Sequence, residues 1–301
     1  MKKLIEKGLT YVSIAVFLAA TVTYLMCSGV RKGDLVSARE MVGILDISEL
    51  TPSETKRLDE LLNREVSPCG DDVSLGKALH DREGCPLAPM AVDFIMDMLM
   101  EDYNVEEVSA AYMSRYAALK GLEIPIDGSP RMGAEDPQVM LVVFSDFGCP
   151  HCAKAAVALE DLVRSYPDDL AMVYKHYPLK SHPMAEMTAR AAFSAHRQGK
   201  FWEMHDTLFS AQGSQLTRER IDAMAVGLGL DIEEFEEDLG SPAATSAIEA
   251  DVKLGKELGV DGTPTVFVNG RKLDAGMRGV EERVREEFLR HAVLEGRKKT
   301  R

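Results

Sequence analysis

Apolar runs alternate with amphipathic stretches through the second half of this 301-residue chain. Short apolar runs of this length predict buried strands, and apolar residues at helical spacing predict helices. The expected order is a strand at 139–144, a helix at 150–166, a strand at 170–176, a helical stretch at 183–258, a strand at 265–268, an Asn-Gly turn, a strand near 272–273 and a helix at 280–294. This order predicts a βαβ half and a ββα half with a helical insertion between them.

The first half predicts a small helical region. A helix is expected from Pro52 to Leu62, because Thr51 and Glu54 have the spacing of a capping box and proline suits the first helical position. A second short helix is expected around Leu75 and Leu79.

The stretch from Met90 to Met100 is apolar except for Asp93 and Asp97. These acids and Glu101 recur every four residues, so they share one face of a helix. The pattern predicts a helix that is buried on its other sides. An adaptable, methionine-rich contact surface is the alternative interpretation.

Residues 8–29 contain no charged side chain, and lysines precede them. This length and flanking charge predict a helix that spans a bilayer, so the membrane is an expected partner of the chain. A cleaved signal peptide is the alternative, but the apolar core is long for one and lacks a clear cleavage site. The uncleaved anchor is therefore expected, in a single pass through the inner membrane.

The net charge of the chain is −14, which argues against nucleic acid as a partner. Four of the five cysteines lie outside the predicted anchor, as two pairs. An even number of cysteines suits a compartment outside the cytoplasm, where disulfides persist. We therefore expect the bulk of the chain in the periplasm or its equivalent.

The tetrapeptide Cys149-Pro150-His151-Cys152 stands where a predicted strand gives way to a predicted helix. Unpaired N–H groups at a helix start favour negative charge, and the thiolate is the reactive form of cysteine. Cys149 is expected to be the nucleophile and Cys152, one turn deeper, the resolving thiol. Pro150 fits the first turn, and His151 can stabilise the thiolate by a hydrogen bond or a positive charge.

A second segment, Gly262-Thr263-Pro264-Thr265, precedes the later strand. Together with the CPHC tetrapeptide and the helical insertion, it resembles the DsbA-like thiol:disulfide oxidoreductases. The resemblance implies a thioredoxin-like α/β fold over 138–296, a cis bond before Pro264 and substrate pairing with the Thr263 backbone. Relatives vary at the position of Thr263, so the direction of electron flow stays open between oxidase and isomerase or reductase.

The cysteines allow other interpretations. Cys149 and Cys152 alone could form a structural disulfide or half of a metal site, but no second CxxC or HxxxH completes a tetrahedral set, so neither a metal nor a cofactor is expected. Cys69 and Cys85 predict a structural disulfide, with a second redox pair as the alternative. Asp146 is interpreted as an exposed loop residue, with a proton relay as the sharper hypothesis.

The predicted organisation is an anchor at 1–30, a helical region with a cysteine pair at 31–121, a linker at 122–137, a catalytic domain at 138–296 and a basic tail at 297–301. Within the linker, the prolines and glycines of 124–133 are also compatible with an early extended segment. The predicted function is disulfide formation in reduced or misfolded exported proteins, with a membrane redox partner that recycles the dithiol. An isomerase or reductase, and an anchored chaperone that binds clients through Met90–Met100, are the competing hypotheses.

Overall fold

The computed structural model describes residues 37–38, 45–70, 73–81, 85–117, 121–212, 216–273 and 279–299. The chain divides into two compact units, Met1–Leu119 and Lys120–Arg301. Within the described ranges, no helix has both the length and the apolar character that a membrane span needs. The predicted anchor at 8–29 lies outside the described residues.

The first unit is helical. Its elements are α2 (Pro52–Arg64), α3 (Leu75–His80), α4 (Ala88–Met100), α5 (Val105–Tyr112) and a π-helical turn, η1 (Met113–Ala117). The predicted capping box is confirmed, since the Thr51 N–H donates to Glu54 Oε2 at 2.6 Å and the Glu54 N–H donates to Thr51 Oγ1 at 3.3 Å. The helix α5 was not predicted.

The helix α4 is amphipathic as predicted. Its buried face carries Ala91, Val92, Ile95 and Leu99. The acids of the opposite face, Asp93, Asp97 and Glu101, are all exposed. Met96 and Met98 are half-buried and Met100 is 42% exposed, so the helix buries one apolar face and leaves part of its methionine-rich surface open.

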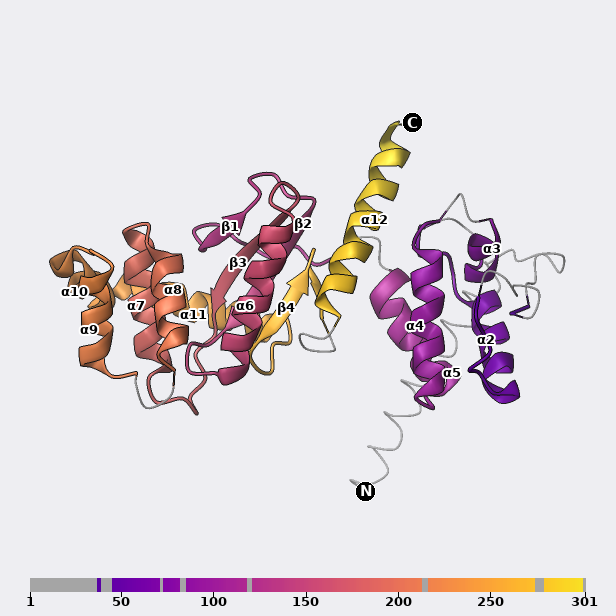
Figure 1. Cartoon of the computed structure of the whole chain (residues 1–301), viewed down its shortest axis with the longest axis horizontal. Helices are drawn as coiled ribbons and strands as arrows, with labels where there is room; N and C mark the ends of the chain where they lie inside the picture. The colour runs from indigo at the N-terminus through magenta and orange to yellow at the C-terminus, as the bar shows by residue number, and fades with distance from the viewer. Residues whose placement is uncertain are drawn as a thin grey trace, which may run out of the picture. The chain divides into compact units, whose positions relative to one another are not determined.

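The second unit is built on a five-stranded sheet (Figure 1). The strands are β1 (Arg131–Gly133), β2 (Val139–Ser145), β3 (Leu170–His176), β4 (Thr265–Val268) and β5 (Arg271–Lys272), in the spatial order β1-β3-β2-β4-β5. Strands β2 and β3 are parallel, and the other pairs are antiparallel. The α/β fold expected from the sequence is confirmed.

Strand β1 lies within the predicted linker at 122–137 and agrees with the alternative of an early extended segment, since it pairs with β3 through Arg131↔Val173 and Gly133↔Ala171. Its three residues carry no apolar run, so hydrophobic patterning could not reveal it. Gly133 has φ +93°, and a Cβ there would lie 2.3 Å from the carbonyl oxygen of Leu170. Only glycine allows the backbone this close to β3.

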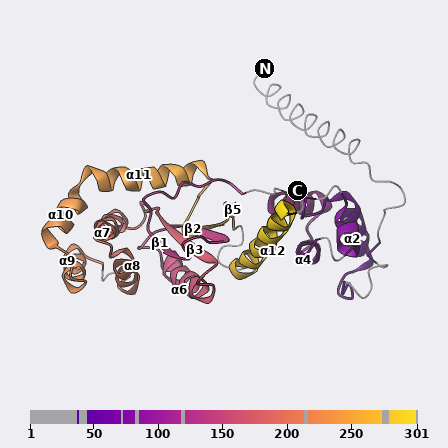
Figure 2. The ribbon, with the colours of Figure 1, turned by 90° about the horizontal axis from the view of Figure 1, so that it is seen from above.

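Helices cover both faces of the sheet. The helix α6 (Pro150–Ser165) packs on one face and α11 (Pro242–Glu257) on the other, as Figure 2 shows. The insertion contributes α7 (Ala185–Arg197), α8 (Phe201–Ser210), α9 (Arg218–Gly227) and α10 (Ile232–Gly240), which share a separate apolar core. The last helix, α12 (Val280–Lys299), packs Val280 and Val284 on the α6 face. It continues through residues 297–299, which were predicted to be a tail.

Strand alternation explains the two cores. Val139, Leu141 and Val143 point toward α6, and Val142 and Phe144 point toward α11. Because successive strand side chains face opposite sides, a nearly continuous apolar run belongs to a strand covered on both faces. This double cover holds the end of β2, where the reactive tetrapeptide follows, in one position.

Candidate active site

The dithiol lies at the start of α6. Cys149 is the N-cap residue, with extended backbone angles of φ −89° and ψ 118°, and Pro150 occupies the first turn. The Cys149 carbonyl accepts the N–H of Cys152 at 3.0 Å, so the helix begins at the tetrapeptide. Both cysteines are free thiols, and Cys149 is 5% exposed against 1% for Cys152. The first thiol therefore sits at the positive end of the helix, and the second is enclosed.

Burial determines the protonation state of the second thiol, Cys152. It raises the pKa of Cys152 to about 12, against the weaker lowering effects of hydrogen bonds from Ser145, Asp146 and Thr263. A thiol with this pKa stays protonated at neutral pH. Cys152 is therefore the enclosed, protonated thiol of the pair, and the assignment of Cys149 as nucleophile and Cys152 as resolving thiol stays a prediction.

The loop before β4 covers the dithiol. Thr265 pairs with Phe144 across the antiparallel β2–β4 ladder, which brings this loop to the start of α6. The Thr263–Pro264 peptide bond is cis, as expected. The Cys149 thiol donates to the Thr263 carbonyl at 3.3 Å. The fold thus unites two motifs that are 114 residues apart in sequence.

Pro150 and His151 are exposed on the first turn of α6. Cys149 and Cys152 are buried beside them. An incoming protein would therefore meet the imidazole and the proline ring before either sulfur.

Asp146 is buried, with 2% exposure, which corrects its interpretation as an exposed loop residue. Its Oδ1 accepts the N–H of Gly148 at 2.8 Å, and its Oδ2 accepts the N–H of Leu179 at 2.9 Å. The His182 Nδ1 lies 2.7 Å from the same Oδ2. A Cβ at Gly148 would lie 2.8 Å from His182 Cβ, so glycine is needed for this packing. Asp146 therefore ties the turn before Cys149 to the loop that follows β3.

Gln212, which follows α8, also holds this turn. Its Nε2 donates to the carbonyls of Phe147 and Cys149, both at 2.9 Å. The sequence offers no local pattern for this role, because the contact spans 63 residues. The helical insertion is thereby anchored to the backbone of the reactive residue.

A buried ion pair lies at the end of β3. Lys175 Nζ is 3.0 Å from Asp251 Oδ1, and the His176 N–H donates to Asp251 Oδ2 at 2.9 Å. Burial raises the pKa of Asp251, although Lys175 opposes the shift. Burial also lowers the pKa of His176 to about 3, so this imidazole is neutral at physiological pH. Since Lys175 and His176 pair with Phe144 and Ser145, these groups support the strand that leads into the site.

In the first unit, Cys69 and Cys85 form a disulfide with a Cα–Cα distance of 5.6 Å. The predicted pairing is confirmed. The two residues are 1% and 2% exposed, so neither sulfur is open to a partner thiol in this conformation. Thiol exchange requires access, and the pair therefore fits a structural crosslink better than a redox relay.

The sheet order, the cis-proline loop and the CxxC pair at a helix start define a thioredoxin-fold protein of the thiol:disulfide oxidoreductase class. A sequence model for the family described as Thioredoxin matches residues 126–284, which is more than half of the chain. The chain belongs to this family.

Relatives and solved structures add the following similarities. The chain is 41% identical over 156 residues to the Na(+)/H(+) antiporter NhaA of Herminiimonas arsenicoxydans, a match that covers 50% of this chain and 24% of the antiporter. The NhaA 1 antiporter of Mycolicibacterium vanbaalenii is 38% identical over 141 residues, which covers 46% and 23%. The chain thus spans about a quarter of the length of these curated relatives.

Among solved structures, a thioredoxin-like oxidoreductase from Silicibacter pomeroyi is 26% identical, with a TM-score of 0.49, and covers 57% of this chain and 95% of its own. BdbD from Bacillus subtilis, in its oxidised form, is 20% identical, with a TM-score of 0.49, and covers 57% and 97%.

Proposed function

We propose that the chain is a membrane-anchored oxidase that introduces disulfides into exported proteins outside the cytoplasm. Residues 8–29 would hold it in the inner membrane, and the second unit would act in the periplasm. Its substrates would be reduced or misfolded exported proteins, and a membrane redox partner would restore its disulfide. The expected anchor rests on the uncharged run in the sequence.

The observation that carries the proposal is the inequality of the two thiols. Cys149 sits at a helix N-terminus, where positive potential favours negative charge on its sulfur. Cys152 is enclosed, and its pKa is about 12. A reduced form stabilised at one sulfur makes the disulfide form a stronger oxidant.

The reaction starts from the oxidised enzyme, with a Cys149–Cys152 disulfide. A substrate thiolate attacks Cys149 Sγ, the Cys149–Cys152 bond breaks, and Cys152 leaves and takes up a proton. The second substrate thiol loses its proton and attacks the substrate sulfur of the mixed disulfide, which releases Cys149. Two electrons pass from the substrate dithiol to the enzyme, and the substrate gains one disulfide.

The loop at Thr263 supplies a means of holding the substrate. Its carbonyl already lies 3.3 Å from Cys149 Sγ, so it borders the reacting atom. An extended substrate segment could pair with the Thr263 backbone in the manner of an added strand. Such pairing reads the main chain of the substrate, which suits an enzyme with many clients.

The test is a redox titration of the Cys149/Cys152 couple in glutathione buffers, together with oxidation of a reduced model protein. The oxidase proposal predicts a potential well above about −200 mV, in the direction of about −120 mV. Cys149→Ser should abolish oxidation of the model protein. A potential near −270 mV, the thioredoxin value, would overturn the oxidase and support the reductase that Thr263 motivates.

The chaperone hypothesis is tested with the same protein. If Met90–Met100 held clients, binding of an unfolded protein would survive loss of both thiols in Cys149→Ser/Cys152→Ser. The burial of Ala91, Val92, Ile95 and Leu99 within the first unit leaves α4 less apolar surface for such a role. This observation favours the oxidase.

A further inference from the structure

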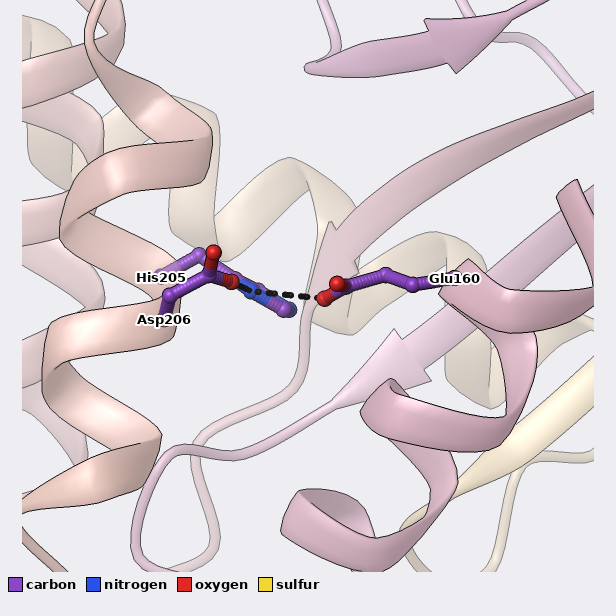
Figure 3. Close-up of side chains that lie close together, drawn as sticks. All are labelled: Glu160, His205 and Asp206. Atoms are coloured by element: carbon purple, nitrogen blue, oxygen red, sulfur yellow. Dashed lines mark hydrogen bonds and ion pairs between the residues drawn. The ribbon is translucent and has the colours of Figure 1, made fainter. Parts of the chain in front are cut away.

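A second cluster of chemically active side chains lies away from the dithiol. Glu160 extends from α6, and His205 and Asp206 extend from α8, so that the three side chains meet between these helices (Figure 3). His205 Nδ1 is 2.9 Å from Asp206 Oδ1 and 3.6 Å from Glu160 Oε1. One nitrogen and two carboxylate oxygens therefore converge on one point.

We propose that Glu160, His205 and Asp206 form a binding site for a divalent transition metal ion of the Zn²⁺ type. Imidazole nitrogen with carboxylate oxygen is a recognised ligand set for Zn²⁺, and three protein ligands leave a fourth position for water. The proposed site is separate from the dithiol, because Glu160 lies about 15 Å along α6 from Cys149.

The spacing of the ligand atoms fits such an ion. With metal–ligand distances of about 2.1 Å, two ligands of a tetrahedral ion are roughly 3.4 Å apart, and two adjacent ligands of an octahedral ion roughly 3.0 Å. The observed Nδ1–O separations of 2.9 and 3.6 Å bracket these values. All three ligand atoms lie within 4.8 Å of one another. The two Nδ1–O separations need change by only a few tenths of an ångström, and rotation of the exposed Asp206 side chain can adjust the spacing of the two carboxylate oxygens.

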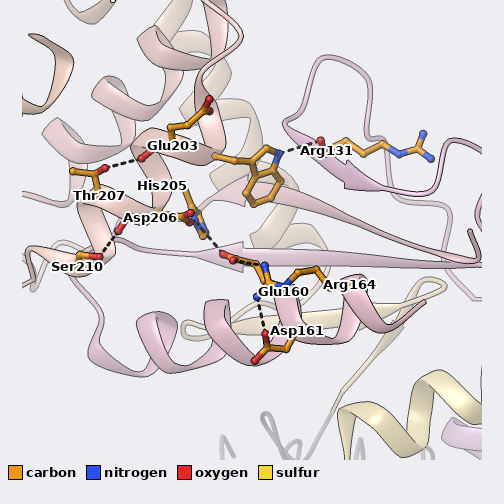
Figure 4. Close-up of polar contacts among 10 residues, drawn as sticks. Arg131, Glu160, Asp161, Arg164, Glu203, His205, Asp206, Thr207 and Ser210 are labelled. Atoms are coloured by element: carbon orange, nitrogen blue, oxygen red, sulfur yellow. Dashed lines mark hydrogen bonds and ion pairs between the residues drawn. The ribbon is translucent and has the colours of Figure 1, made fainter. Parts of the chain in front are cut away.

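Charge favours an ion there. Two carboxylates approach the same histidine nitrogen, with Asp206 Oδ1 at 2.9 Å and Glu160 Oε1 at 3.6 Å from His205 Nδ1. Arg164 contacts the other oxygen, with its Nη1 at 3.4 Å from Glu160 Oε2, so Oε1 remains directed at His205 (Figure 4). A dication bound to both carboxylates would offset the repulsion between their negative charges.

The surroundings hold the imidazole in place. His205 is 2% exposed. Its ring contacts those of Phe147, Tyr174 and Phe209 at centroid distances of 4.8 to 5.8 Å. An apolar wall of this kind limits water on one side and fixes ring orientation, which strengthens coordination. Asp206 is largely exposed, which gives an ion a path from solvent.

A bound ion would join α6, which carries the dithiol, to α8 of the helical insertion. The ion would then take its ligands from two helices that pack in different hydrophobic cores. We therefore expect metal binding to stabilise the second unit against unfolding, since binding to the folded state alone raises stability by mass action.

The test is calorimetric titration of Zn²⁺ into the full chain in detergent, without an affinity tag and stripped with EDTA. The active-site pair is first oxidised to a disulfide, so that its thiolates do not compete. We expect one equivalent to bind with a Kd of about 10 µM or tighter, and the thermal midpoint to rise by about 5–10 °C at 100 times the Kd.

Asp206→Asn should weaken binding at least about tenfold and remove the thermal shift, and this exposed, isosteric change leaves the fold intact. Glu160→Gln should do the same from the other helix. Glu203→Gln is the matched control, because Glu203 is an exposed acid of α8 that pairs with Lys200 instead. Absence of stoichiometric binding below about 100 µM, or equal binding by Asp206→Asn, Glu160→Gln and Glu203→Gln, would overturn the proposal and leave an internal ion pair.

Discussion

The reactivity of Cys152 can be measured directly once Cys149 is removed. Cys149→Ser leaves Cys152 as the free thiol of the tetrapeptide, still 1% exposed and beneath the Thr263 loop. Burial is the largest cause of its raised pKa, and the neighbouring Cys149 is the smallest. We therefore expect the substitution to leave the pKa of Cys152 near 12.

The magnitude follows from this value. At pH 8, a thiol with a pKa of about 12 is ionised to about one part in 10⁴, against about a quarter for an ordinary thiol with a pKa near 8.5. The loss of thiolate is roughly 2,000-fold. Greater nucleophilicity of the more basic thiolate restores roughly 25- to 60-fold. Alkylation of Cys152 should therefore be about 40- to 100-fold slower than that of an exposed cysteine, before enclosure slows it further.

The assay is pulsed alkylation with iodoacetamide from pH 7 to pH 10, quantified for the Cys152 peptide by mass spectrometry. The rate should rise about tenfold per pH unit without a plateau, because ionisation stays incomplete over this range. The same variant unfolded in urea is the control, and its rate should level off above pH 9. A plateau below pH 10 in the folded protein would refute the argument from burial.

Four further predictions concern the stability of the two units. Asp251→Asn should lower the free energy of unfolding by about 3–5 kcal/mol in urea titrations, because it strands the buried Lys175 charge, and adding Lys175→Met should restore part of the loss. Because the folded-state pKa of His176 is lowered to about 3 from 6.5, its contribution is present above pH 6.5 and is lost at about 1.4 kcal/mol per pH unit as the pH falls from 6.5 toward 3. His176→Gln should flatten the acid limb of a stability–pH curve by that amount, and an unchanged limb would contradict the shift. Cys69→Ser/Cys85→Ser should destabilise the first unit by about 2–4 kcal/mol, while the midpoint potential of Cys149/Cys152 stays the same. Gly255→Ala should cost about 1–3 kcal/mol in urea titrations, since its Cβ would lie 2.6 Å from the Tyr177 ring, whereas Gly227→Ala, with open space around it, should cost much less.

Most of the fold could be predicted from local sequence patterns. The apolar runs at 139–144, 170–176 and 265–268 mark three strands almost to the residue, because strands covered on both faces must be continuously apolar. The capping box at Thr51 and Glu54 marked the start of α2. Strand β1 could not be assigned as a strand from the sequence, because it has three residues and its first and last are exposed. Only its pairing with β3 defines it.

The site residues fall into the same two groups: those that a local motif marks, and those that only tertiary packing brings together. The reactive thiols could be predicted because they lie in a short motif at a strand-to-helix junction, whereas the cis bond before Pro264 was implied by the family resemblance. The exposed-loop interpretation of Asp146 was wrong, since two of its partners, the Leu179 N–H and the His182 imidazole, come more than 30 residues later. Gln212 and the Glu160–His205–Asp206 cluster were missed for the same reason. Contacts made by tertiary packing alone leave no trace in local spacing.

The helical insertion between β3 and β4 separates the dithiol from the Thr263 loop in sequence, and therefore in the order of synthesis. Thr263 follows Cys149 by 114 residues, which at about 5–20 residues per second of synthesis is a delay of roughly 6–23 s. The residues of β2 and α6 are therefore synthesised before those of β4, which completes their sheet. For that interval the nascent dithiol stands without its covering loop, open to any thiol or oxidant nearby. A partly synthesised chain therefore exposes its dithiol to more reaction partners than the complete, folded protein does.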